Sequence, residues 1–174
     1  KHNLAVDSEY NKRRISCENI VKEVKLLKPE VNSLRDVTLK DLQSVAENSD
    51  AIDIKRAKYV IEENERVHQM MKALTEGDAQ AVGRILKEGH WAMSTQYEIT
   101  TPELDALVKI GEDLNGILGS RMMGGGFGGC TINLIETTKL DSSISSLLEA
   151  YKKETNIEAE YYHLAIDDGV KVFS

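Results

Sequence analysis

The chain has 174 residues, of which 41% are hydrophobic and 29% are charged, and its formal net charge is -7. This length and composition suit a globular protein with a real core, and the negative charge gives no reason to expect binding to nucleic acid or to an anionic membrane. We find neither an apolar run long enough to span a bilayer nor a signal peptide, so we expect a cytoplasmic protein.

Hydrophobic residues at three- and four-residue steps predict that the first two-thirds of the chain is helical. The predicted helices cover roughly residues 9–27, 39–46, 54–74, 79–93 and 102–114. Asp7 or Ser8 is expected to cap the first helix, and Thr101 followed by Pro102 is a strong start for the last.

Several polar or sulfur-containing side chains on these helices are interpreted structurally. His68, Met70 and Met71 lie on the helical stripe of residues 54–74, so we expect them in the core rather than at a ligand. The consecutive residues Lys12–Arg14 are interpreted as a solvated basic patch close to Tyr10.

The last third of the chain predicts strands around a glycine-rich loop, followed by a helix and two more strands. The strands are expected over residues 117–123, 130–135, 159–166 and 170–173, with a hairpin turn at 167–169 and a helix capped by Asp141. The predicted fold class is α+β, with helices packed on one face of a small antiparallel sheet and a β-loop-β-α-β-β end.

Five of the twelve glycines fall between Gly124 and Gly129. The spacing matches G-x-G-x-x-G, but a strand pattern follows it where a dinucleotide site requires a helix. Either this is a tight hairpin without a ligand, or it is a loop that abuts a ligand or another segment. The number of glycines exceeds what a two-residue turn requires, which favours the second interpretation.

The chain shows no sequence motif for metal binding or for nucleophilic catalysis. Cys17 and Cys130 lie far apart and are expected to be reduced thiols, with Cys130 as a small buried side chain in a strand rather than a nucleophile. Paired carboxylates near the loop, a P-loop motif and a Ser/His/Asp motif are also missing.

A resemblance extends these predictions. The segment Gly-Ser-Arg-Met-Met-Gly-Gly-Gly-Phe-Gly-Gly-Cys-Thr at 119–131 closely resembles the third signature motif of galactokinases, within the GHMP small-molecule kinase superfamily. His-Asn-Leu at 2–4, Ser-Glu-Tyr-Asn at 8–11 and Pro-Glu-Leu-Asp at 102–105 resemble the same family in order and spacing. The resemblance covers essentially the whole chain.

The resemblance implies that residues 1–174 are the C-terminal domain of such a kinase, with the N-terminal domain absent from the chain. The implied reaction transfers the γ-phosphoryl group of ATP to the anomeric hydroxyl of galactose, with Mg²⁺. No catalytic residue is expected in this chain, because the catalytic carboxylate and its partner arginine are expected upstream of Lys1. The ATP and Mg²⁺ sites are expected mainly there too.

The resemblance also implies roles for residues that are present. Tyr10 corresponds to a tyrosine that lines the sugar pocket, and Lys1 to a basic position near the active-site carboxylate. The loop that closes against the phosphate-binding loop corresponds to Gly124, Gly125, Gly126, Phe127, Gly128 and Gly129. Met123 stands where many members have Thr, and Gly125 where many have Ala.

Three alternatives remain open from the sequence. The parent protein could be a kinase for N-acetylgalactosamine, or a non-catalytic galactokinase-like sensor that binds sugar and ATP and signals to a protein. The chain could also be a free-standing binding module. The upstream phosphate loop would distinguish the sensor, and cooperative unfolding of the chain alone would support the module.

Overall fold

The computed structural model describes residues 4–164, so Lys1, the predicted turn at 167–169 and the predicted last strand at 170–173 lie outside the described residues. The described elements are α1 (Leu4–Leu27), α2 (Leu39–Val45), α3 (Ala51–Glu76), α4 (Ala79–Ala92), α5 (Pro102–Asp113), β1 (Ile117–Met123), β2 (Cys130–Ile135) and α6 (Leu140–Thr155). They confirm the predicted order of helices followed by strand, loop, strand and helix.

Most of the predicted helix starts are confirmed, and two are wrong. Thr38 and Thr101 cap α2 and α5 through their side chains. However, α1 begins at Leu4, so Asp7 and Ser8 lie within the helix. Asp141 also lies within its helix, because a 3₁₀ turn at Thr137–Lys139 leads directly into α6 and places the N-cap at Lys139, which makes no side-chain cap bond.

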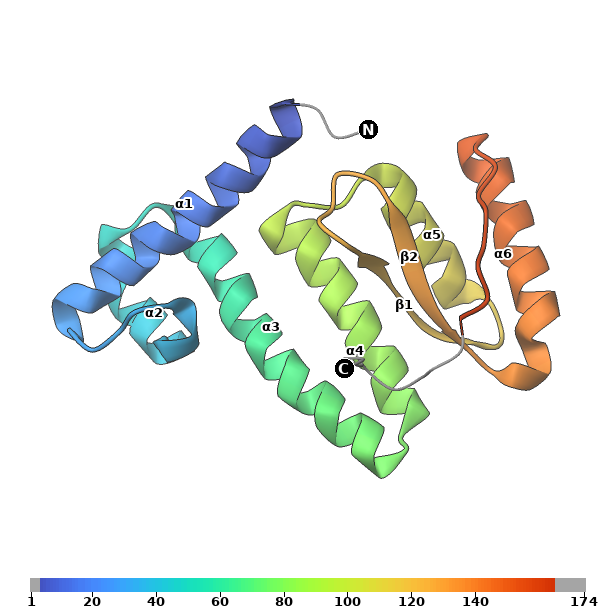
Figure 1. The fold of residues 1–174 in the computed structure, drawn as a ribbon, viewed down its shortest axis with the longest axis horizontal. Coiled ribbons are helices and arrows are strands. Elements are labelled where there is room, and N and C mark those ends of the chain that lie inside the picture. The colour runs from blue at the N-terminus through green and yellow to red at the C-terminus, as the bar shows by residue number, and fades with distance from the viewer. Residues whose placement is uncertain (1–3, 165–174) are drawn as a thin grey trace, which may run out of the picture.

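The elements form an elongated molecule in which α3 connects the two ends (Figure 1). The helices α1, α2 and the first half of α3 enclose one hydrophobic cluster, centred on Ile20 and Val24. α3 and α4 then run side by side as an antiparallel hairpin, while α4 and α5 pack on β1 and α6 packs on α5. None of the helices that the structure describes is long and apolar enough to cross a membrane.

The sheet of the described residues is a single antiparallel pair. Ser120 pairs with Asn133 and Met123 pairs with Cys130, with a register shift between Ile117 and Gly119. This arrangement confirms the α+β class. The strand expected over 159–166 is wrong for residues 159–164, which are irregular and largely exposed, because the segment pairs with neither β1 nor β2.

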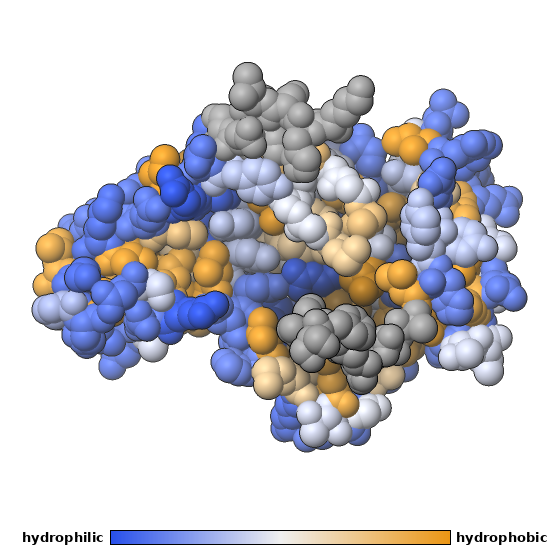
Figure 2. All heavy atoms as spheres, in the orientation of Figure 1, coloured by the Kyte–Doolittle hydropathy of each residue, from blue (hydrophilic) through white to orange (hydrophobic). Residues whose placement is uncertain are grey.

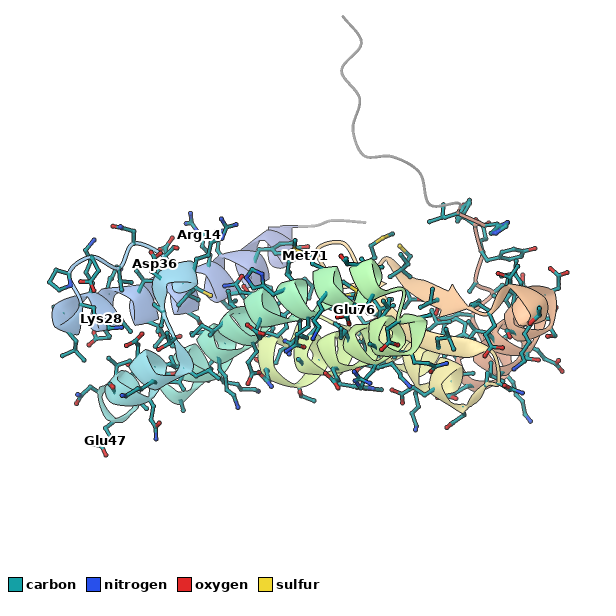
Figure 3. All side chains as sticks on the ribbon, turned by 90° about the horizontal axis from the view of Figure 1, so that it is seen from below. Arg14, Lys28, Asp36, Glu47, Met71 and Glu76 are labelled. Atoms are coloured by element: carbon teal, nitrogen blue, oxygen red, sulfur yellow. The ribbon has the colours of Figure 1, made fainter. Side chains whose placement is uncertain are left out.

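The second half of α3 is more exposed than its pattern predicts. Met71 is 62% exposed and His68 is also exposed, so only Met70 of these three residues is partly buried as expected (Figure 3). The reason is that this half of α3 packs on α4 alone, through Ala73, whereas the first half also packs on α1 and α2.

Hydrophobic side chains are exposed at the far end of the molecule too. Leu27 is 63% exposed at the end of α1. Figure 2 shows hydrophobic surface at this end of the molecule, which α1 and α2 form. The helical stripe therefore continues beyond the part of α1 that α2 and α3 cover.

The contact between α4 and β1 is made by main-chain atoms. A Cβ at Gly83 would lie 2.2 Å from the carbonyl oxygen of Leu118, and a Cβ at Gly119 would lie 2.0 Å from that of Gly83. Glycine at both positions therefore allows the helix and the strand to touch directly.

A buried histidine adds a polar link between the same two elements. His90 of α4 is fully buried, and its Nδ1 accepts a hydrogen bond of 3.1 Å from the backbone N–H of Met122. Its Nε2 lies 3.1 Å from Oδ1 of Asp105. Burial lowers the pKa of His90, and the Asp105 carboxylate opposes that shift. The neutral ring is the form that can accept from Met122.

We predict that Gly83→Ala and Gly119→Ala each destabilise the fold by about 2 kcal/mol or more, because the added methyl group overlaps main-chain atoms. For Gly83 this loss would override the gain in helix propensity that Ala brings. Urea unfolding of the protein that contains this domain measures the effect. Gly77→Asn is a matched control, since Gly77 has a left-handed φ of 69° and no atom near its Cβ position. Unchanged stability in both alanine variants would contradict the contact.

We also predict a pH dependence from His90. Its folded pKa lies below the ordinary value of 6.5, so the unfolded chain takes up the proton first. Stability is therefore fully present above pH 6.5 and falls as the pH drops below it, with a slope of at most about 1.4 kcal/mol per pH unit. His90→Asn keeps an acceptor for Met122 and should remove this slope in urea unfolding between pH 5 and 6.5. An unchanged slope in the variant would contradict the assignment.

Candidate functional site

The loop between β1 and β2 has a backbone that depends on its glycines. Gly124, Gly126, Gly128 and Gly129 have φ values of 91°, 88°, 124° and 108°, which L residues rarely adopt. Strands lie on both sides of the loop, so no helix N-terminus is available for a pyrophosphate. The prediction that a strand rather than a helix follows the loop is confirmed.

The tip of the loop is tied to the segment before α5. Phe127, which also has a left-handed φ of 59°, donates its backbone N–H to the carbonyl oxygen of Ile99 at 2.7 Å. A Cβ on Gly126 would lie 2.3 Å from the same oxygen. The Phe127 ring packs against the hydrophobic cluster that contains Met93, Leu104 and Met122. The loop is thus attached to the core rather than projecting freely.

The first helix lies against the other side of the loop. The rings of Tyr10 and Phe127 meet edge to face, with centroids 5.4 Å apart and planes at 87°. A Cβ on Gly125 would lie only 1.9 Å from the hydroxyl oxygen of Tyr10. The structure therefore brings together Tyr10 and the glycine loop, the two features that the sequence singled out, although they are more than a hundred positions apart.

Arg13 also belongs to this site, although its sequence pattern did not predict it. Arg13 was expected in a solvated basic patch, but its side chain is only 6% exposed. Its guanidinium lies over the Phe127 ring, 5.2 Å from the centroid, and donates to backbone carbonyls of Tyr97 and Glu98. A signal was available, because Arg13 follows Tyr10 by three residues and so shares its helix face.

The two cysteines have different surroundings. Cys17 is half-buried, and burial raises the pKa of its thiol. Cys130 is exposed, which corrects the expectation of a buried side chain. It begins β2 opposite Met123, which is itself 46% exposed, so this end of the sheet is open on one face. The raised pKa of the Cys17 thiol disfavours a nucleophilic role for that residue.

The described part of the site is aromatic side chain and main chain rather than a cluster of metal-ligating side chains. Over residues 4–164 no group of three or more His, Cys, Asp or Glu side chains converges as a metal would require. What the site does offer is an aromatic side chain beside an exposed main chain. No atom of the described residues lies within 4 Å of the Cβ positions of Gly124 and Gly128, so these residues leave the backbone there open to a ligand.

Comparisons with known proteins agree with this geometry. The family model described as "GHMP kinases C terminal" matches residues 70–153. Among curated proteins, the galactokinase of Clostridium beijerinckii is 36% identical over 172 residues, which is 98% of this chain and 44% of that protein. The galactokinase of Thermotoga maritima is 37% identical over 171 residues, again 98% of this chain and 46% of that protein. The chain thus spans less than half the length of these relatives.

A solved structure is also similar. The crystal structure of Lactococcus lactis galactokinase complexed with galactose matches with a TM-score of 0.83 and 28% identity, over 93% of this chain and 42% of that one. At 93% of the chain, the similarity extends well beyond residues 70–153, the segment that the family model matches. On these grounds the chain is similar over nearly its whole length to the C-terminal part of galactokinases, and residues 70–153 match the C-terminal model of the GHMP kinases.

Proposed function

We propose that this chain is the C-terminal domain of a galactokinase, which transfers the γ-phosphoryl group of ATP to the anomeric hydroxyl of galactose. The observation that carries the proposal is the similarity to galactokinases over 98% of the chain. The relative of known structure that it resembles is described as complexed with galactose. An N-terminal domain outside this chain would complete the enzyme, which we propose acts in the cytoplasm.

Within this enzyme the chain would supply one wall of the sugar pocket. The half-buried Tyr10 presents an aromatic face and a hydroxyl, which match the apolar and polar faces of a hexose. The glycine loop lies against that tyrosine and offers main-chain groups without side chains in front of them. Transfer of a phosphoryl group depends mainly on positioning and charge stabilisation, and this wall would contribute to positioning.

The residues described here do not fit a Mg²⁺ site, because no cluster of acidic side chains converges among them. We therefore derive no step through the metal from this chain. We propose that the Mg²⁺ site, the catalytic carboxylate and most ATP contacts lie in a part of the protein outside this chain. The relatives that this chain matches are more than twice as long as it is.

The other interpretations have less support. The relatives and the solved structure compared here are galactokinases, so neither a kinase for N-acetylgalactosamine nor a sensor is favoured by any of them. A free-standing binding module is also less well supported, because nearly the whole chain is similar to only a part of much longer enzymes.

We predict that the full-length protein releases ADP from ATP only when galactose is present. The measurement is coupled ADP release with a panel of hexoses, N-acetylgalactosamine and an ATP-only blank. Turnover with galactose well above the other sugars supports the proposal. Turnover that requires N-acetylgalactosamine, or galactose binding without any turnover, would contradict it and favour the kinase or sensor alternative respectively.

We further predict that Tyr10→Ala weakens galactose binding about 10-fold or more, because it removes the aromatic wall, whereas Tyr10→Phe loses less. Isothermal titration of the full-length protein with galactose measures both. Tyr162→Ala is the matched control, since Tyr162 is 78% exposed and its hydroxyl bonds only to Glu160. Equal affinity in the wild type and Tyr10→Ala would remove Tyr10 from the sugar site.

A further inference from the structure

Arg13 is a buried charge whose guanidinium bonds both to its own helix and to the segment at Tyr97 and Glu98. Its Nε donates to the carbonyl oxygen of Tyr97 at 3.1 Å, and its Nη2 donates to that of Glu98 at 2.6 Å. Its Nη1 forms an ion pair with Glu9, one turn earlier on α1. A guanidinium is stable out of water only when its donors are satisfied in this way, so the geometry around Arg13 is closely defined.

The two carbonyls are free because a helix ends there. A π-helix at Met93–Tyr97 follows α4, and Glu98 then takes a left-handed φ of 59°. The last carbonyls of a helix lack partners within the helix, and a basic side chain often binds them. Here the basic side chain comes from α1, so Arg13 joins the start of α1 to the segment that precedes α5.

The same guanidinium also contacts the glycine loop, through the ring of Phe127. Its central carbon lies 5.2 Å from the centre of the Phe127 ring, a cation–π contact. Phe127 is also held by its hydrogen bond to Ile99, only one residue beyond Glu98. The edge-to-face contact then joins Phe127 to Tyr10. One arginine thus contacts both the segment and the ring that fix the tip of the loop.

Tyr10 and Arg13 act from one face of α1. They are three residues apart, and both reach the loop, Tyr10 at Gly125 and Phe127 and Arg13 at Phe127. Gly125 does not have a positive φ, so its lack of a side chain is needed for space alone. A methyl group there would displace the Tyr10 hydroxyl. The position of Tyr10 therefore depends on how closely the loop lies against α1.

We infer that Arg13 is a positioning residue, which holds Phe127 and with it the glycine loop against Tyr10 and so sets the shape of the sugar-binding wall. The inference rests on the proposed function, since Tyr10 matters only if galactose binds there. Arg13 does not itself touch the sugar in this account. Its effect passes through Phe127, whose ring contacts both the arginine and the tyrosine.

The test uses the full-length protein with Arg13→Gln, Phe127→Leu and the double variant. Hydrogen–deuterium exchange of the peptide covering residues 122–131 should be faster in Arg13→Gln than in the wild type, without any ligand. This readout tests the contact even if the protein proves not to be a kinase. Unchanged exchange in a folded Arg13→Gln variant would overturn the inference.

The kinetic readout separates positioning from general stability. We expect Arg13→Gln to raise the KM for galactose about 10-fold, while the KM for ATP changes less than about 3-fold. Arg13→Lys should bring the KM for galactose only part of the way back to the wild-type value, because lysine lacks the planar stacking face. Phe127→Leu should raise the KM for galactose in the same way, and the double variant should raise it no more than the stronger single variant does. Additive effects, or equal changes in both KM values, would overturn the inference.

Two safeguards keep the test decisive. Arg14→Gln is the matched control, since Arg14 is the adjacent arginine, is 69% exposed, points outward from α1 in Figure 3 and pairs with Glu18 at 3.7 Å. It should leave exchange and both KM values unchanged. If Arg13→Gln does not fold, Phe127→Leu alone must raise KM for galactose selectively, and failure to do so would overturn the inference. Absence of turnover in the wild type would instead contradict the proposed function.

Discussion

The direct backbone contact between α4 and β1 determines where the glycine loop lies. Because Gly83 and Gly119 have no side chains, the helix and the strand touch, and the buried His90 accepts the N–H of Met122 a few residues further along. The loop begins immediately after this strand. A larger separation of α4 from β1 would move the loop away from Ile99, its anchor near the end of α4.

The candidate site is held together by contacts between distant parts of the chain. The first helix supplies Tyr10 and Arg13, the turn after α4 supplies the carbonyls of Tyr97 and Glu98, and the loop supplies Phe127. None of these segments could form a binding wall alone. The exposed main chain of the loop is thus presented by a rigid scaffold, as is usual for binding sites in enzymes.

The sequence predicted the local features of the fold well and the long-range ones less well. Capping residues and periodicity located most helices, and the glycine loop and Tyr10 were singled out from residue types and resemblance. The exposure of Met71 and Cys130 and the burial of Arg13 were not predicted. Periodicity shows which face a residue shares but not how much of that face another element covers. The wrong prediction of a strand at 159–164 has a similar cause, because a strand needs a pairing partner and its own sequence does not show whether one is present.

The central proposal for this protein is that Tyr10 and the glycine loop form one wall of a sugar pocket. The most direct measurement is a crystal structure of the full-length protein with bound galactose. The account predicts that the sugar lies against the Tyr10 side chain, beside the main chain of Gly124–Gly129, with Phe127 still beneath Arg13. A sugar bound elsewhere in the protein, or a loop separated from Tyr10 in the complex, would contradict it.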